Sequence, residues 1–148
     1  MATVEEQNQA PESSTGIGEQ NKAPASSTGM DPKLGALLSY LLGIIGGVIF
    51  LLIEKDNKYV RFHAAQSIVF GATVFIIGIA WGIFAGIVTA IPGIGFVGAI
   101  LFLVLPLFWL GVFVIAIMLI IRAWTDYDKG VTFKLPVIGG IAEKIAGQ

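Results

Sequence analysis

The stretch "IVFGATVFIIGIAWGIFAGIVTAIPGIGFVGAILFLVLPLFWLGVFVIAIMLII" (Ile68–Ile121) decides the fold of this chain. It contains two apolar runs, Ile68–Ile91 with 24 residues and Val97–Ile121 with 25, separated by "PGIG" (Pro92–Gly95). At about 1.5 Å per residue, each run can cross the roughly 30 Å hydrocarbon layer of a bilayer as a tilted helix. An isolated apolar strand would leave unpaired amides in lipid, so helices are predicted. Proline ends the first run and glycine accepts a positive φ, which predicts a helical hairpin.

A third apolar run, "LGALLSYLLGIIGGVIFLLI" (Leu34–Ile53), has 20 residues without a charge and matches the same thickness. The composition agrees, because 55 % of the 148 residues are hydrophobic, only 13 % are charged and the mean hydropathy is +0.84. We therefore predict an all-α integral membrane protein with three transmembrane helices, over about 34–53, 58–91 and 96–123, of which the second and third form the hairpin.

A polar sequence, "EKDNKYVRFHAAQS" (Glu54–Ser67), separates the first two runs. Asp56 or Asn57 is a natural N-cap, and no helix breaker follows until Pro92. The second helix is thus longer than the hydrocarbon layer, and its first turns are expected in the interface. Glu54, Lys55 and Lys58 are expected in water, and Arg61 is expected to extend toward lipid phosphates.

His63, Gln66 and Ser67 are spaced i, i+3, i+4 and therefore share one helix face. Two interpretations remain open for this face. It is either a polar helix end satisfied by headgroups, water and backbone, or a site that faces the bundle and binds a partner or ligand. The candidate partner or lipid contacts of this stretch are Lys55, Lys58, Arg61, His63, Gln66 and Ser67.

Glycines recur every four residues in the second run, and small residues at this spacing let helix backbones approach closely in membranes. The first run repeats the spacing once. We predict helix packing through these positions, either with another helix of the chain or with another copy: Gly43, Gly47, Gly78, Gly82 and Gly86.

The two ends of the chain differ from the membrane domain, 31–148. Residues 1–30 contain a direct repeat at a spacing of 13, "EQNQAPESSTG" and then "EQNKAPASSTG", and the scarcity of large apolar residues predicts a disordered tail. The C-terminal "KLPVIGGIAEKIAGQ" is too polar to span. It is predicted to form a short amphipathic helix over about 136–146 that lies along the membrane surface or folds back on the bundle.

Basic residues in the flanks predict the orientation in the cell membrane, because cytoplasmic flanks are enriched in them. With three spans, seven basic residues fall on the side of the polar sequence and the C-terminus, and two on the other side. The prediction is a cytoplasmic C-terminus and an external N-terminus.

Residues for chemistry are scarce. The spans contain no carboxylate, and the chain has one histidine and no cysteine. "DYDKG" (Asp126–Gly130) resembles part of a calcium loop but lacks the further oxygen ligands, so a solvated turn is expected. We expect no enzyme activity, no cofactor and no metal. The expected partners are the lipid bilayer, other membrane proteins or further copies of the chain, and no nucleic acid.

Three sequences together, "LLSYLLGIIGGVIFLLIEKDNKYVRFHAAQS", "IPGIG" and "FKLPVIGGIAEKIA", resemble the small prokaryotic membrane proteins grouped as domain of unknown function 4870. That family is described as similar to the Tic-twenty component of chloroplast protein import. The resemblance covers about Asp31–Ala146 and implies a multi-helix membrane protein, without implying catalytic residues. From the glycine-rich helix faces, the basic polar sequence and the C-terminal helix we expect a non-enzymatic scaffold or accessory subunit of a membrane complex. The alternative is a subunit of an oligomeric channel or protein translocator.

Overall fold

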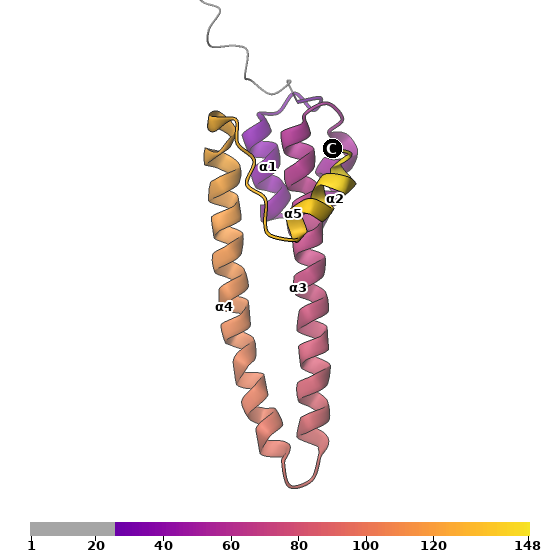
Figure 1. Cartoon of the computed structure of the whole chain (residues 1–148), viewed down its shortest axis with the longest axis vertical. Helices are drawn as coiled ribbons and strands as arrows, with labels where there is room; N and C mark the ends of the chain where they lie inside the picture. Colours follow the sequence, from indigo (N-terminus) through magenta and orange to yellow (C-terminus); the bar gives the residue numbers. More distant parts are fainter. Residues whose placement is uncertain (1–25) are drawn as a thin grey trace, which may run out of the picture.

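The computed structural model describes residues 26–148, and most of the repeat predicted for the tail lies outside this range. All secondary-structure elements of the described residues are helices, which confirms the predicted all-α class (Figure 1). In chain order it consists of α1 (Pro32–Leu41), α2 (Gly43–Ile53), α3 (Lys58–Ala90), α4 (Gly95–Thr125), the short 3₁₀ helix η1 (Tyr127–Lys129) and α5 (Ile138–Ala146).

The α3–α4 pair forms the longest part of the molecule (Figure 1). Both helices are long and apolar enough to cross a membrane. The chain reverses at Gly93, where φ is +86°, and the indole N–H of Trp81 joins the two helices by donating to the carbonyl oxygen of Leu101 at 3.1 Å. The two long apolar runs thus form the hairpin that the sequence predicts.

The prediction of a single helix over 34–53 is wrong. The structure has two short helices there, α1 with 10 residues and α2 with 11. Gly43, at the junction, has a φ of +58°, a conformation that L side chains adopt only with strain. The chain therefore turns back, and the start of α1 lies near the end of α2. A Cβ on Gly35 would lie 3.7 Å from Cδ1 of Phe50. The described chain has two helices that could span a membrane, and the predicted third span is replaced by this short α1–α2 hairpin.

The core lies at one end of the molecule, where α1, α2, α5 and the last turns of α4 surround the first half of α3 (Figure 1). It forms three clusters of buried apolar residues. They are Ala36, Tyr40, Tyr59, Leu119 and Ala123; Phe62, Ala65, Ala142 and Ala146; and Phe50, Val60 and Ala64. We call this part, residues 26–71 and 115–148, the polar end, because it also contains the polar sequence and both chain ends of the described range.

The C-terminal helix α5 folds back on the bundle. Its Ala142 and Ala146 are buried against Phe62 and Ala65 of α3. Of the two arrangements left open by the sequence, the structure thus has α5 packed on another helix.

The predicted placement of the N-terminal flank opposite the C-terminus is also wrong for the described residues. The Nζ atom of Lys33, at the start of α1, lies 2.6 Å from Asp128. Because α1 and α2 turn back at Gly43, Lys33 lies at the polar end rather than at the Gly93 turn.

Candidate functional site

Glu54 is the most heavily bonded side chain of the polar end. Its Oε1 accepts hydrogen bonds from the backbone N–H and the hydroxyl of Ser27, at 3.0 and 2.7 Å, and from the backbone N–H groups of Asp56 and Asn57, at 3.1 and 3.0 Å. The Ser26 hydroxyl donates to Oε2. Glu54 is completely buried, so the expectation that it lies in water is wrong. Desolvation alone would raise its pKa, but these hydrogen bonds outweigh desolvation and lower the pKa to about 2.

This carboxylate binds three segments together: the residues before α1, the end of α2 and the start of α3. Asn57 completes the junction as the N-cap of α3, since its Oδ1 accepts from the backbone N–H of Val60 at 3.2 Å. Of the six candidate contacts, Lys55 and Lys58 are the two that are exposed.

Arg61 does not extend toward solvent. Its Nη1 donates to the carbonyl oxygens of Glu54 at 2.8 Å and Leu51 at 3.2 Å, and its Nε donates to that of Ala146 at 3.2 Å. These carbonyls lie at the C-terminal ends of α2 and α5, where the helix dipole favours a cation. Arg61 therefore links three helices instead of reaching lipid phosphates.

His63 and Gln66 face the interior of the bundle. Both are at most 1 % exposed. The Gln66 amide donates to the hydroxyl of Tyr40 at 2.9 Å, and this hydroxyl lies 2.9 Å from Nδ1 of His63. The histidine tautomer determines which of the two, the hydroxyl or Nδ1, is the donor. Gln66 also contacts the segment before α5, accepting from the backbone N–H of Leu135 at 3.4 Å and donating to the carbonyl oxygen of Phe133 at 3.5 Å.

Ser67 completes this face and contacts the α1–α2 hairpin. Its hydroxyl lies 3.0 Å from the carbonyl oxygen of Ala64 and 3.3 Å from that of Gly43. A Cβ on Gly47 would lie 2.6 Å from the carbonyl oxygen of Ala64, so Gly47 does permit a close helix contact. Because His63, Gln66 and Ser67 are buried within the chain, they are not surface contacts for a partner.

The predicted glycine positions have three different roles. Gly47 packs against α3, and Gly43 forms the positive-φ turn rather than a packing surface. Gly78, Gly82 and Gly86 are open. A Cβ on any of them would have no atom of the described chain within 4 Å, apart from its own neighbourhood in α3.

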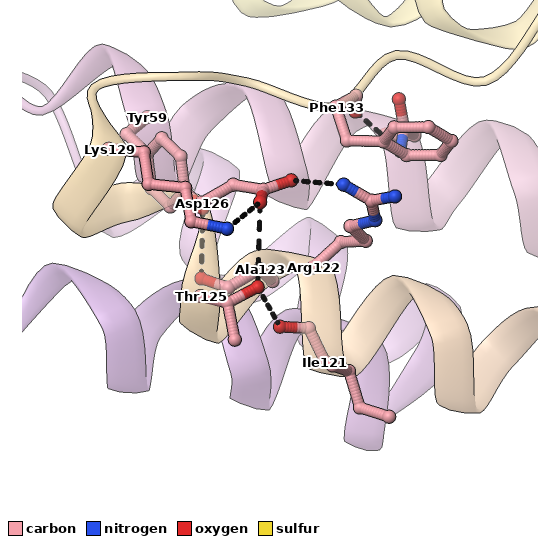
Figure 2. Close-up of polar contacts among 9 residues, drawn as sticks. Tyr59, Ile121, Arg122, Ala123, Thr125, Asp126, Lys129 and Phe133 are labelled. Atoms are coloured by element: carbon pink, nitrogen blue, oxygen red, sulfur yellow. Dashed lines mark hydrogen bonds and ion pairs between the residues drawn. The ribbon is translucent and has the colours of Figure 1, made fainter.

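A second polar cluster joins α3, α4 and η1 (Figure 2). The Tyr59 hydroxyl donates to the carbonyl oxygen of Ala123 at 2.9 Å. Asp126 is only 2 % exposed and lies between two cations, with Nη1 of Arg122 at 3.6 Å and Nζ of Lys129 at 3.8 Å. The prediction of a solvated turn over Asp126–Gly130 is therefore wrong for Asp126, which is buried.

Sequence reasoning missed the contributions of Tyr40, Tyr59, Glu54 and Asp126. The available signal was their position, because each is a polar side chain next to or inside an apolar run. Within residues 26–148, no group of three or more His, Cys, Asp or Glu side chains is placed to hold a metal ion.

The arrangement defines a class: a helical membrane protein with two long apolar helices, whose polar residues at one end connect the helices to one another. A family model described as the magnetosome magnetite crystal formation protein family matches residues 27–141. The chain belongs to this family.

Named relatives are prokaryotic membrane proteins. A UPF0132 membrane protein of Archaeoglobus fulgidus is 36 % identical over 118 residues, which cover 80 % of this chain and 98 % of the relative. Two UPF0132 membrane proteins of Methanocaldococcus jannaschii are 36 % and 34 % identical over 115 residues, covering 78 % of this chain and 70 % and 88 % of the relatives. No solved structure matches the chain.

Proposed function

We propose that the protein is a non-enzymatic scaffold or accessory subunit of a membrane complex, and that it meets its partners through residues 72–114, here called the hairpin end. The proposal rests on how few residues of the hairpin end are buried within the chain. Within residues 72–114, all of which the structure describes, only Ala85 and Gly98 are buried. The open row of Gly78, Gly82 and Gly86 lies on the same segment and suits close approach of another apolar helix.

The bonding of the polar end supports a structural role for that part. Glu54, Arg61 and Gln66 each bind backbone groups of other segments, so their polar atoms are used to hold the helices together. The matched family is described by crystal formation at the magnetosome rather than by a reaction on a small molecule. We therefore propose no enzyme activity and no cofactor. The partners that fit the hairpin end are further copies of the chain or other membrane proteins.

Basic residues support a cytoplasmic polar end in the cell membrane. The described chain has eight lysines and arginines, and all of them lie in the polar end: Lys33, Lys55, Lys58, Arg61, Arg122, Lys129, Lys134 and Lys144. Both ends of the described range are then cytoplasmic. Single cysteines introduced by Met30→Cys and Lys144→Cys should react with an impermeant maleimide only after cell lysis. Labelling of Met30→Cys in intact cells would contradict this orientation.

Self-association through the glycine row is tested by energy transfer between labelled copies in liposomes. Gly82→Leu fills the row and should weaken association by about tenfold, or about 1.4 kcal/mol. Gly111→Leu is the matched control, because Gly111 on α4 is equally open and lies outside the row. Equal losses in the two variants would contradict the role of the row.

The wider proposal is tested by crosslinking in native membranes. A chain that crosslinks neither to itself nor to another membrane protein would contradict a scaffold role. Solute flux through liposomes that contain only the purified protein would favour the channel or translocator subunit instead.

A further inference from the structure

The α1–α2 hairpin extends along only about half of the length of α3. At about 1.5 Å per residue, α1 and α2 are roughly 15 and 17 Å long, against about 30 Å for the hydrocarbon layer. The tip of the hairpin lies beside Ser67, whose hydroxyl is 3.3 Å from the carbonyl oxygen of Gly43. A Cβ on Gly71 would collide with Ile44. Beyond this level α3 runs on to Ala90, past the reach of the α1–α2 hairpin (Figure 1).

The outer surface of the α1–α2 hairpin suits lipid. Leu41, Ile45 and Leu52 are 63, 71 and 70 % exposed, and α2 contains no charged or polar side chain. Both ends of the hairpin are instead fixed by polar contacts, through the Lys33–Asp128 ion pair and through Glu54. Both ends of the α1–α2 hairpin thus lie at the polar end, so in a bilayer crossed by α3 and α4 the hairpin would enter from the polar side and return to it.

Helix α5 lies at the polar end as well and also has exposed apolar side chains. Its inner face packs on α3, whereas Ile141 and Ile145 of α5 are 46 and 44 % exposed, and Val137, the residue before the helix, is 84 % exposed. Glu143 of α5 also forms an ion pair with Lys134, so the helix carries a charged side chain as well. A short helix with apolar and charged surfaces is typical of the boundary between headgroups and acyl chains.

The turn before α5 holds an apolar side chain outward. Val137 has a φ of +66° and lies at the centre of a tight turn in which the N–H of Ile138 donates to the carbonyl oxygen of Pro136 at 2.7 Å. This geometry is strained for a β-branched residue. Val137, the most exposed of the three residues, thus lies in the strained turn just before α5.

We propose that the protein acts as a wedge that generates and senses membrane curvature. One leaflet accommodates α1, α2 and α5 together with parts of α3 and α4, whereas the other accommodates only α3 and α4. The leaflet that contains more protein is expanded relative to its partner, so the bilayer bends with the polar end on the convex side. The acyl chains of that leaflet cover the exposed faces of α1, α2 and α5. This activity goes beyond the scaffold role and does not depend on partners at the hairpin end.

The test measures orientation in vesicles of two sizes, at a protein density low enough that copies do not crosslink. The chain has no cysteine, so Lys144→Cys reports the side of the polar end through an impermeant maleimide. The ratio of outward to inward polar ends should be at least about twofold higher in vesicles of roughly 50 nm than of roughly 400 nm, because shallow insertion is sensitive to curvature. An equal ratio in both sizes would overturn the proposal. A size dependence seen only where copies crosslink would also overturn it, because a second copy would then cover these faces.

Two glycine variants test whether the dependence on vesicle size arises from the α1–α2 hairpin. Gly43→Leu places a branched side chain at a positive φ and favours one continuous helix over residues 32–53, about 33 Å long, which can span the bilayer. The ratio should then become independent of vesicle size, and Met30→Cys in this background should label from the side opposite to Lys144→Cys. Gly111→Leu should keep the wild-type size dependence, since Gly111 lies away from the α1–α2 hairpin. If Gly43→Leu labels with the wild-type topology yet loses the size dependence, the wedge geometry is not its cause and the proposal fails.

A second measurement uses the unmodified chain, in case Gly43→Leu does not fold. Electron cryomicroscopy of proteoliposomes should show the mean vesicle diameter falling as the protein-to-lipid ratio rises. A constant diameter over the same range would overturn curvature generation.

Discussion

Two stretches of α3, each nine residues long, show how differently one helix is stabilised along its length. In Tyr59–Ser67 every residue except Arg61 is buried, and its polar side chains bind other segments. In Gly78–Gly86 only Ala85 is buried. The two stretches lie in the same apolar helix, yet the first is surrounded by protein, and the second contacts only α4 and the surroundings of the molecule (Figure 1).

The difference shows which forces operate at each end. In a bilayer, apolar residues gain little from burial against protein, because lipid is equally apolar. The bare stretch can therefore remain a stable helix without covering its apolar side chains. Polar groups behave differently, because they need partners wherever water is excluded. The buried stretch is fixed in place by hydrogen bonds that lipid does not provide. We expect substitutions in the first stretch to act on folding, and those in the second to act on association.

The largest expected difference comes from removing one phenylalanine ring from each stretch. Phe62 is 1 % exposed and packs against α5, whereas Phe84 is 52 % exposed. Phe62→Ala should lower the free energy of unfolding by about 3 kcal/mol, because it leaves a cavity, and Phe84→Ala by less than about 1 kcal/mol. Titration with sodium dodecyl sulfate in mixed micelles, followed by circular dichroism, measures both. Equal losses would contradict the division of α3 into buried and bare stretches.

The next effect concerns the carboxylate that joins the buried stretch to its neighbours. Glu54→Gln removes a charged acceptor of five hydrogen bonds and should lower the free energy of unfolding by about 2 kcal/mol. Glu143→Gln is the matched control, because it loses only the exposed ion pair to Lys134 and should cost at most about 1 kcal/mol. A cost for Glu54→Gln no larger than that of the control would mean that the junction does not depend on its charge.

The ends of the two long helices could be predicted from the sequence because local capping and turn residues mark them. The two helices begin and end within two residues of the expected positions, since Asn57 caps one and the Pro92–Gly93 turn separates them. The first apolar run gave no such signal. Twenty uncharged residues are compatible both with one span and with two short helices that turn back. The choice depends on the φ of Gly43 and on packing against Ser67, which lies 24 residues further along the chain.

The sequence does not show in which direction the candidate residues of α3 face. The spacing of His63, Gln66 and Ser67 predicts one shared helix face, but spacing does not show whether that face packs inside the chain, as the structure has it, or meets a partner. Tyr40, which contacts both His63 and Gln66, belongs to the run that was predicted to span the membrane. Similarly, the burial of Glu54 depends on Ser26 and Ser27, far away in sequence. Contacts of this kind arise from the tertiary fold and leave no local pattern.

Acid should weaken the polar end before the hairpin end. The folded-state pKa of Glu54 is lowered from 4.5 to about 2, so its contribution to stability is fully present above the unfolded-state pKa. This contribution should disappear gradually as the pH falls from about 4.5 to about 2, because the unfolded chain binds a proton first. Hydrogen exchange of the α1–α2 hairpin, measured by mass spectrometry across this range, should increase more than that of residues 78–86. Glu54→Gln should remove most of the difference, and an unchanged pH dependence in that variant would assign it to another group.

The smallest effect tests a single hydrogen bond between the buried stretch and α4. Tyr59→Phe removes the hydroxyl that donates to the carbonyl oxygen of Ala123 and keeps the ring, which stacks edge-on with those of His63 and Tyr127. The free energy of unfolding should fall by about 1 kcal/mol. Tyr127→Phe is the control, since Tyr127 contributes its ring to Tyr59 and to the Lys33 cation, and it should change stability by less. If both variants cost the same, the hydrogen bond from Tyr59 to Ala123 contributes no measurable stability of its own, and the prediction is wrong. If only Tyr59→Phe is destabilising, the polar contacts of the buried stretch are what align the two long helices.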